Sequence, residues 1–200
     1  MKILSVVPVF ADGGWTKRCL DRIQTDLLVI DNGAHTDVIP VIKGYNVLVN
    51  PKNIYVNPAW NQAMLYFLNC GDWTHLCIIN SDLVLMQNWH ELIELIWQPN
   101  LIPCVNEGQS DSQELMAGHE VESVPGIFLF LSREQVSKVF PIPYGLKFWF
   151  GENWIYNRLG LVKFQYDNLK AVHGNSRSCS VLPEFVDMVE KDKQVWDAIN

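Results

Sequence analysis

Charged residues are scarce in this sequence, and basic residues are scarcer than acidic ones. Asp, Glu, Lys and Arg make up 18% of the 200 residues, with 15 Lys and Arg against 22 Asp and Glu, so the formal net charge is −7. A chain with this balance has no basic stripe for binding phosphates, which disfavours broad nucleic-acid binding. The 48% hydrophobic content disfavours disorder and suits one compact domain over residues 1–200.

Long hydrophobic runs and paired cysteines are also lacking. The opening apolar run, Ile3–Pro8, is too short for a signal peptide or a membrane span. The cysteines fit neither a metal-knuckle spacing nor a disulfide framework; they are Cys19, Cys70, Cys77, Cys104 and Cys179. We therefore expect reduced, mostly buried thiols in a cytoplasmic protein without a transmembrane segment.

A glycine-rich phosphate loop is the third absence. Ala11–Gly14 follows the first expected strand, yet it forms no G-x-G-x-x-G and no Lys-Ser/Thr follows it in P-loop register. Dinucleotide binding and P-loop chemistry are therefore poorly supported. A sugar nucleotidyltransferase would carry Arg and Lys in this loop, and it remains only a minor alternative.

The sequence does contain short buried strands with helical segments between them. Four runs are rich in Val, Ile and Leu without alternation, as strands covered on both faces require; they are Ile3–Phe10, Asp26–Asp31, Tyr45–Asn50 and His75–Asn80. Further strands are expected at 101–106, 126–132 and 161–167. Together with the helices below, they predict an α/β fold with a mixed central sheet flanked by helices.

Helix signals separate these runs. The first helix is expected at Thr16–Gln24, and a second has Asn57 as its N-cap and ends at Gly71. Asn88 with Glu91 has the spacing of a capping box for a third helix. A final amphipathic helix carries Phe185, Val189, Trp196 and Ile199.

Polar residues follow three of the expected strands where those strands end, at Ala11–Gly14, Asp31–Gly33 and Asn80–Asp82. Open α/β sheets bind ligands outside the carboxyl ends of their strands, so these segments are expected to share one site. Asp82 suits Mg²⁺ or Mn²⁺ together with phosphate oxygens, and Asp31 suits a ribose hydroxyl or a base N–H. Each segment is also typical of a simple turn, and that alternative stays open.

The segment Lys147–Gly160 combines aromatic residues with an acid at an expected helix start. Trp149 and Phe150 precede Glu152, and partial desolvation by such neighbours raises the pKa of a carboxyl toward the range of a general base. We therefore expect Glu152 to be the catalytic base. The alternative is that the aromatic residues are core and Glu152 only favours the helix N-terminus.

His173 and Arg177 lie in another polar segment, Ala171–Ser180. Histidine can supply the nitrogen ligand of an otherwise oxygen-rich Mn²⁺ site, and a guanidinium can hold phosphate oxygens. The alternative for a lone histidine is a structural or surface role.

Taken in order, these segments resemble glycosyltransferase family 2 on the GT-A fold. The resemblance covers about residues 3 to 180 and rests on LSVVPVF, LLVIDNG, NPAWNQAM, IINSDLVL, FGENWIYNRLG and VHGNS. It implies a Rossmann-like nucleotide-diphospho-sugar transferase with a nucleotide-sugar-binding half (1–105) and an acceptor and catalytic half (106–200). The compact size is similar to GT-A domains of phages, large viruses and multidomain transferases, so the expected alternatives are a virus- or phage-encoded protein in the host cytoplasm and one domain of a longer protein.

The resemblance also implies residue roles. Asp31 would read the donor base, Asn61 would lie behind the donor site, and Arg177 would assist at the diphosphate. Asp82 would bind Mn²⁺ or Mg²⁺, and His173 matches a further metal ligand of some members. The remaining donor-binding residues would be Pro8, Val9, Phe10, Asn80 and Ser81.

The sequence departs from the family at two acids, because Asn80 replaces the first acid of the D-x-D motif and Asn153 the second acid of the E-D pair. Glu152 would then deprotonate the acceptor hydroxyl in a single inverting displacement. The implied reaction is hexosyl transfer from a nucleotide sugar, with UDP favoured and GDP or dTDP possible, to a glycan, glycoprotein or lipid-linked acceptor. The two departures keep open a non-catalytic carbohydrate- or nucleotide-binding module on the same fold.

Overall fold

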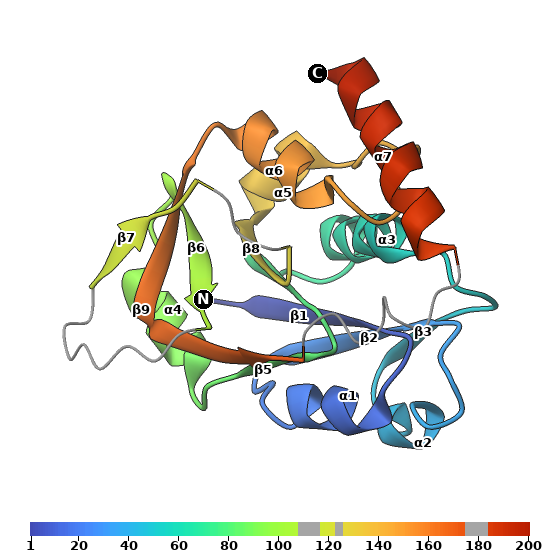
Figure 1. Cartoon of the computed structure of the whole chain (residues 1–200). Coiled ribbons are helices and arrows are strands. Elements are labelled where there is room, and N and C mark those ends of the chain that lie inside the picture. The colour runs from blue at the N-terminus through green and yellow to red at the C-terminus, as the bar shows by residue number, and fades with distance from the viewer. Residues whose placement is uncertain (108–116, 123–125, 175–183) are drawn as a thin grey trace.

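The computed structural model in Figure 1 describes residues 1–107, 117–122, 126–174 and 184–200. Its central sheet has five strands in the order β3-β2-β1-β4-β8. Four are parallel, and β8 runs antiparallel to β4. The strands are β1 (Ile3–Val9), β2 (Asp26–Asn32), β3 (Val47–Asn50), β4 (His75–Ile79) and β8 (Phe128–Ser132). The predicted α/β class with a mixed central sheet is confirmed.

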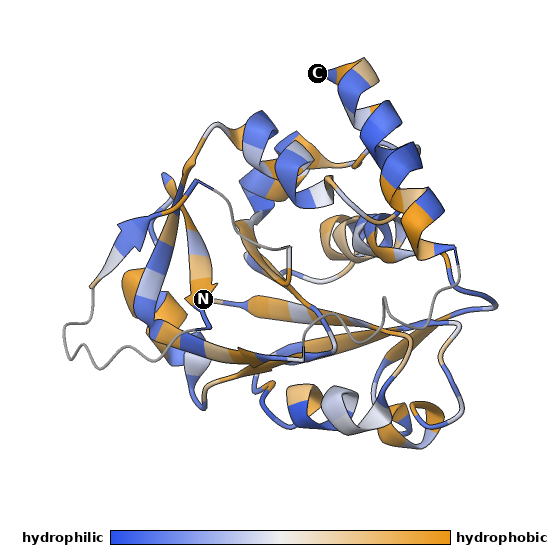
Figure 2. Ribbon diagram, in the orientation of Figure 1, coloured by the Kyte–Doolittle hydropathy of each residue, from blue (hydrophilic) through white to orange (hydrophobic). Residues whose placement is uncertain are grey.

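Helices cover both faces of this sheet (Figure 1). On one side lie α1 (Gly13–Leu20) and α2 (Ile39–Ile42), and on the other lie α3 (Val56–Asn69) and α5 (Arg133–Val139). Successive residues of β1 serve different cores, since Val7 packs with Cys19 on the α1 side, whereas Val6 packs with Met64 on the α3 side. Burial on both faces explains why the strands read as unbroken apolar runs, and Figure 2 shows their hydrophobic colour in the centre of the molecule.

A second, smaller sheet has the order β5-β9-β6, with β7 also paired to β9. Its strands are β5 (Leu83–Leu85), β6 (Leu101–Asn106), β7 (Gly118–Glu120) and the long β9 (Val162–His173). The register between β6 and β9 shifts between Cys104 and Asn106, so that Asn106 pairs with Lys170. Three further helices complete the fold: α4 (Trp89–Ile96), α6 (Gly151–Leu159) and α7 (Phe185–Ile199).

Two expected helix starts and one expected capping bond differ from the structure. The residue before α1 is Asp12, whose side chain accepts from the Trp15 N–H, so this helix begins earlier than Thr16. Asn57 lies inside α3 and donates its side-chain amide to the Trp149 carbonyl, so it is not the N-cap. Asn88 does precede α4, but it is left-handed at φ 59° and makes no side-chain capping bond.

The capping box occurs at a helix that the sequence reading missed. Ser132 accepts from the Gln135 backbone N–H, and the Gln135 side chain accepts from the Ser132 N–H, which starts α5. The short helix α2 was also not predicted. The third strand begins at Val47 rather than Tyr45, and β9 continues to His173, well beyond the expected end at 167.

The cysteines of the described residues are free thiols, and three of the four are buried. Cys19, Cys77 and Cys104 are buried free thiols, whereas Cys70 is an exposed one, and Cys179 lies outside the described residues. Within the described ranges, none of the helices combines the length and apolar character needed to cross a bilayer.

Candidate active site

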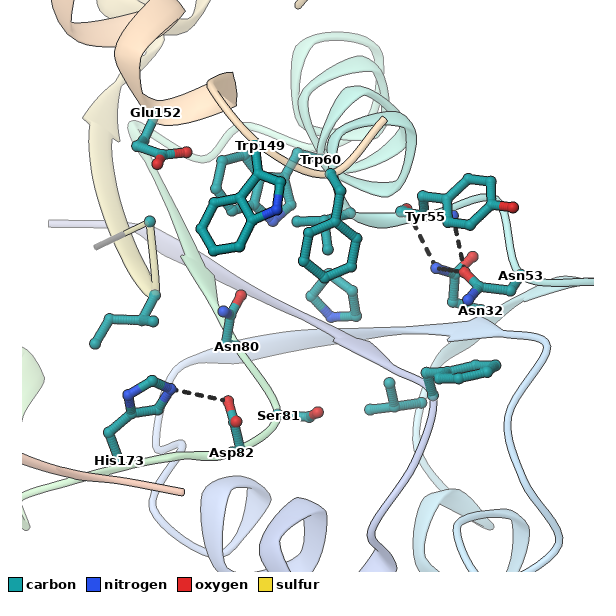
Figure 3. Close-up of a pocket in the computed structure, with 17 residues that line it drawn as sticks. Asn32, Asn53, Tyr55, Trp60, Asn80, Ser81, Asp82, Trp149, Glu152 and His173 are labelled. Atoms are coloured by element: carbon teal, nitrogen blue, oxygen red, sulfur yellow. Dashed lines mark hydrogen bonds and ion pairs between the residues drawn. The ribbon is translucent and has the colours of Figure 1, made fainter. Parts of the chain in front are cut away.

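A cavity of about 190 Å³ opens at the carboxyl ends of β1, β2 and β4 (Figure 3). It takes residues from both halves of the chain. The lining consists of Pro8, Val9, Phe10, Asn32, Asn53, Tyr55, Val56, Trp60, Asn80, Ser81, Asp82, Gly126, Ile127, Phe148, Trp149, Glu152 and His173. Eight predicted site residues are therefore brought together: Pro8, Val9, Phe10, Asn80, Ser81, Asp82, Glu152 and His173.

Asn80, Ser81 and Asp82 form the turn between β4 and β5. The Leu83 N–H donates to the Asn80 carbonyl at 3.0 Å, which closes the turn, and the Asn80 N–H donates to the Ile127 carbonyl at 3.0 Å. Ser81 and Asp82 are buried at 5% exposure each. The turn is therefore present, and the same three residues also line the cavity, so the turn does not exclude a binding role.

His173 lies beside Asp82 because of strand pairing. β5 and β9 are antiparallel with Leu83 opposite His173, and the Gly174 N–H donates to the Asp82 carbonyl at 2.8 Å. The His173 Nε2 is 3.5 Å from Asp82 Oδ1, and both side chains are at least nine-tenths buried (Figure 3). The neighbouring Asp82 carboxylate raises the pKa of His173.

The pair Asp82 and His173 has the chemistry of a partial divalent-cation site. The His173 Nε2 is buried, and no atom of the described residues makes a hydrogen bond to it. Two neighbouring ligand atoms of an octahedral Mg²⁺ or Mn²⁺ lie about 3 Å apart, close to the observed 3.5 Å. No group of three or more His, Cys, Asp or Glu suited to a metal occurs among the described residues, so an ion here would need phosphate and water oxygens as well.

Glu152 approaches the cavity from the opposite side, on the first turn of α6 (Figure 3). Burial raises the pKa of its carboxyl above the ordinary value, and no ion pair to Glu152 is present in the described part of the chain. Asn153 is exposed and is not part of the cavity lining. Of the two positions that resemble the E-D pair in sequence, only Glu152 lines the cavity.

Two glycines, Gly151 and Gly126, allow close packing around α6 and Glu152. A Cβ at Gly151 would lie 2.0 Å from Asn57 Oδ1 of α3, so the helix start requires glycine. A Cβ at Gly126 would lie 2.8 Å from the Trp60 ring and 3.0 Å from Glu152 Oε2. The space beside the Glu152 carboxyl therefore depends on the absence of a side chain at 126.

Phe148 and Trp149, which we call the aromatic roof, are held in place by a residue from α7. The Asp192 carboxylate is 1% exposed and accepts from the backbone N–H groups of Lys147, Phe148 and Trp149 at 2.9, 2.6 and 2.8 Å. The rings of Phe185 and Phe148 also pack edge to face, with 5.4 Å between their centroids. Sequence reasoning missed Asp192, because one acid in an amphipathic helix looks like any solvated residue.

The end of β2 contributes Asn32 rather than Asp31. Asn32 donates its amide to Asn53 Oδ1 and the Tyr55 carbonyl, at 2.9 and 3.2 Å. Asp31 does not line the cavity, and its Oδ1 accepts from the Ala34 N–H at 2.7 Å. Successive side chains of a strand point to opposite faces, and at the end of β2 the residue on the cavity side is Asn32.

Of the two other predicted donor-site residues, only Asn61 lies in the described part of the chain, and it does not line this cavity. Asn61 is committed to the backbone of Ile142, with its amide donating to the carbonyl at 2.9 Å and its oxygen accepting from the N–H at 2.8 Å. It therefore joins α3 to a loop instead of contacting the cavity. Arg177 lies outside the described residues.

Comparison with known proteins gives matches in structure but not in sequence. No protein-family model and no curated protein matches the chain. GalNAc-T7, solved with UDP, GalNAc and Mn²⁺, matches with a TM-score of 0.66 and 13% identity, over 98% of this chain and 49% of that one. The mannosyltransferase PcManGT from Pyrobaculum calidifontis, solved with GDP-Man and Mn²⁺, matches with a TM-score of 0.65 and 11% identity, over 88% and 57%.

A protein of more similar size also matches. A197 from STIV has a TM-score of 0.56 and 14% identity, over 86% of this chain and 85% of that one. The chain spans about half the length of GalNAc-T7 and 57% of the length of PcManGT. Identities this low carry information about the fold alone, and on that evidence the chain has the fold of the GT-A glycosyltransferases.

Proposed function

We propose that this protein is a glycosyltransferase that moves a sugar from a nucleotide-diphosphate donor to an acceptor hydroxyl. One observation carries the proposal: the Asp82–His173 pair and a half-buried Glu152, which has no ion pair among the described residues, face the same cavity from opposite sides. The Asp82–His173 pair suits a cation bound to the diphosphate of a donor, and Glu152 suits a proton transfer. The similarity in fold to transferases solved with UDP and GDP-Man supports this reading.

Asp82 and His173 would hold a divalent cation, Mn²⁺ or Mg²⁺, together with the donor diphosphate. When bound, such an ion neutralises the negative charge that builds up on a nucleoside-diphosphate leaving group. Pro8, Val9 and Phe10 would contact the nucleoside at the end of β1, where they line the cavity.

Glu152 would act as the general base. Its pKa is raised by burial, which makes its carboxylate a stronger proton acceptor than an exposed one. In an inverting displacement the acceptor oxygen bonds to the anomeric carbon, the bond to the diphosphate oxygen breaks, and the hydroxyl proton passes to Glu152. Trp60 and Trp149 line the same cavity and would exclude water from it.

The finer assignments are part of the proposal. We favour a UDP-hexose as the donor, with GDP- and dTDP-sugars as the other candidates, and a glycan, glycoprotein or lipid-linked acceptor. Residues 1–105 would bind the nucleotide sugar, and residues 106–200 would supply the acceptor side and the base. A cytoplasmic location and a virus or phage origin remain predictions from the sequence.

Thermal unfolding with UDP-, GDP- and dTDP-sugars, each with Mn²⁺ and with EDTA, tests the proposal. We expect stabilisation that requires one nucleotide class and the metal, followed by slow release of sugar from that donor. Stabilisation without any sugar release or transfer would favour the non-catalytic binding module, which Asn80 at the position of an expected acid also supports. No stabilisation by any donor would contradict the proposal.

A further inference from the structure

His173 lies between two carboxylates that approach its two ring nitrogens. Asp82 Oδ1 is 3.5 Å from Nε2, and Glu107 Oε2 is 3.5 Å from Nδ1. The Glu107 side chain is 39% exposed, whereas that of His173 is 10% exposed. Because Asp82 and Glu107 contact opposite nitrogens of one ring, they cannot both bind the same cation as His173 does.

The register shift in the second sheet brings Glu107 to this position. Leu101 to Cys104 pair in order with Val162 to Gln165, but Asn106 then pairs with Lys170 instead of Asp167. Glu107 follows Asn106 directly, so the shift carries it along β9 toward His173. Irregularities of this kind re-aim side chains beside functional sites.

The Glu107 carboxylate favours the proton of a neutral imidazole on Nδ1, whereas Asp82, at the same 3.5 Å from Nε2, favours the other nitrogen until a cation neutralises its charge. When Nδ1–H donates to Glu107, the lone pair remains on Nε2, the nitrogen beside Asp82. That Nε2 is buried, and it makes no hydrogen bond within the described ranges. A histidine held in this way is ready to bind a metal through Nε2.

We infer that Glu107 is a positioning residue for the cation of the proposed transferase, holding His173 in the Nδ1–H form with Nε2 turned toward the ion beside Asp82. This inference rests on the proposed function. Glu107 does not contact the ion itself. Partners of this kind typically affect metal affinity by about 10–100-fold.

The test is a titration of the whole chain with Mn²⁺, in which electron paramagnetic resonance measures the concentration of the unbound ion. We expect Glu107→Ala to weaken Mn²⁺ binding by about 10-fold or more. Glu107→Gln should keep most of the affinity, because its amide oxygen still accepts from Nδ1–H. Glu120→Ala, which removes an exposed carboxylate from β7, is the charge-matched control and should bind as the wild type does.

A second measurement reports the imidazole directly. Nitrogen-15 shifts of His173 in the metal-free protein, at a pH where the ring is neutral, should show a larger share of the Nδ1–H form in the wild type and in Glu107→Gln than in Glu107→Ala. In Glu107→Ala the proton should move at least partly to Nε2. This reading separates positioning from a general loss of structure, since an unfolded variant gives the shifts of a free histidine.

Two results would overturn the inference while leaving the metal site intact. One is unchanged Mn²⁺ affinity in Glu107→Ala, and the other is an equal loss in Glu107→Ala and Glu107→Gln, which would make Glu107 a charged ligand. Absence of Mn²⁺ binding by the wild type would overturn the metal role in the proposed function. The tautomer measurement then still decides whether Glu107 positions His173.

Discussion

The two sides of the cavity give a carboxylate different surroundings. On the sheet side, Asp82 lies 3.5 Å from His173 and raises the pKa of that ring, so a negative charge has a basic neighbour. On the roof side, Glu152 lies near aromatic surface, and burial raises the pKa of its carboxyl. In the proposed reaction one acid binds a cation and the other takes up a proton, so two similar side chains have different roles.

The largest test of this contrast removes the acid on the roof side. Glu152→Gln should lower turnover by about 10²–10⁴-fold, the usual contribution of a general base, with donor affinity within about twofold because the shape is kept. Steady-state transfer and calorimetric donor titration measure the two quantities. Full activity in this variant would place the base elsewhere.

Removing the acid on the sheet side should affect binding instead. Asp82→Ala is expected to weaken metal-dependent donor binding by at least about 100-fold, since even residues behind a metal ligand contribute 10–100-fold. Calorimetry with the donor and Mn²⁺ measures this change. Asp72→Ala, which alters an exposed residue paired with Lys2, is the control, and equal donor affinity in the two variants would contradict the assignment.

The roof itself can be loosened without touching either acid. Asp192→Ala leaves three backbone N–H groups without their acceptor, and we expect the free energy of unfolding to fall by about 2–4 kcal/mol. Urea unfolding measures it, with Glu190→Ala, an exposed acid of the same helix, expected to change it by less than about 0.5 kcal/mol. A loss no larger than that of Glu190→Ala would mean that Asp192 does not hold the roof.

The smallest expected effect is a pH dependence of stability. The folded-state pKa of Glu152 lies above its unfolded value, so the folded state binds more protons and its stability falls as pH rises through that window. Glu152→Gln should therefore be the more stable protein at neutral pH and should lose this advantage below the ordinary carboxyl range. Melting temperatures of both proteins from pH 4 to pH 8 test the sign, and an advantage independent of pH would refute it.

The sequence was most informative about the strands, whose apolar residues have to be buried on both faces of the sheet. The parallel strands were predictable because both of their faces are covered, as Val6 and Val7 show by packing into different cores. Their ends then indicated the site, and Asp82, Glu152 and His173 line one cavity as the order of motifs implied.

The remaining features depend on partners that are distant in the chain. Asn57 has the sequence signature of an N-cap, but its amide is taken by Trp149 from another segment. Asp192 and Glu107 act through the 147–149 loop and through His173, and no local pattern points to either contact. The choice between Asp31 and Asn32 follows from strand alternation, whose phase the sequence leaves open.

The glycine at 126 has a consequence for how such a protein can evolve. One added methyl group there would press on Trp60 and on Glu152 Oε2, closing the space beside the carboxyl while every acid of the site stayed in place. A descendant with alanine at position 126 would thus keep Asp82, Glu152 and His173 and still lose the proposed reaction. The substitution responsible would lie at Gly126, a position with no functional group of its own.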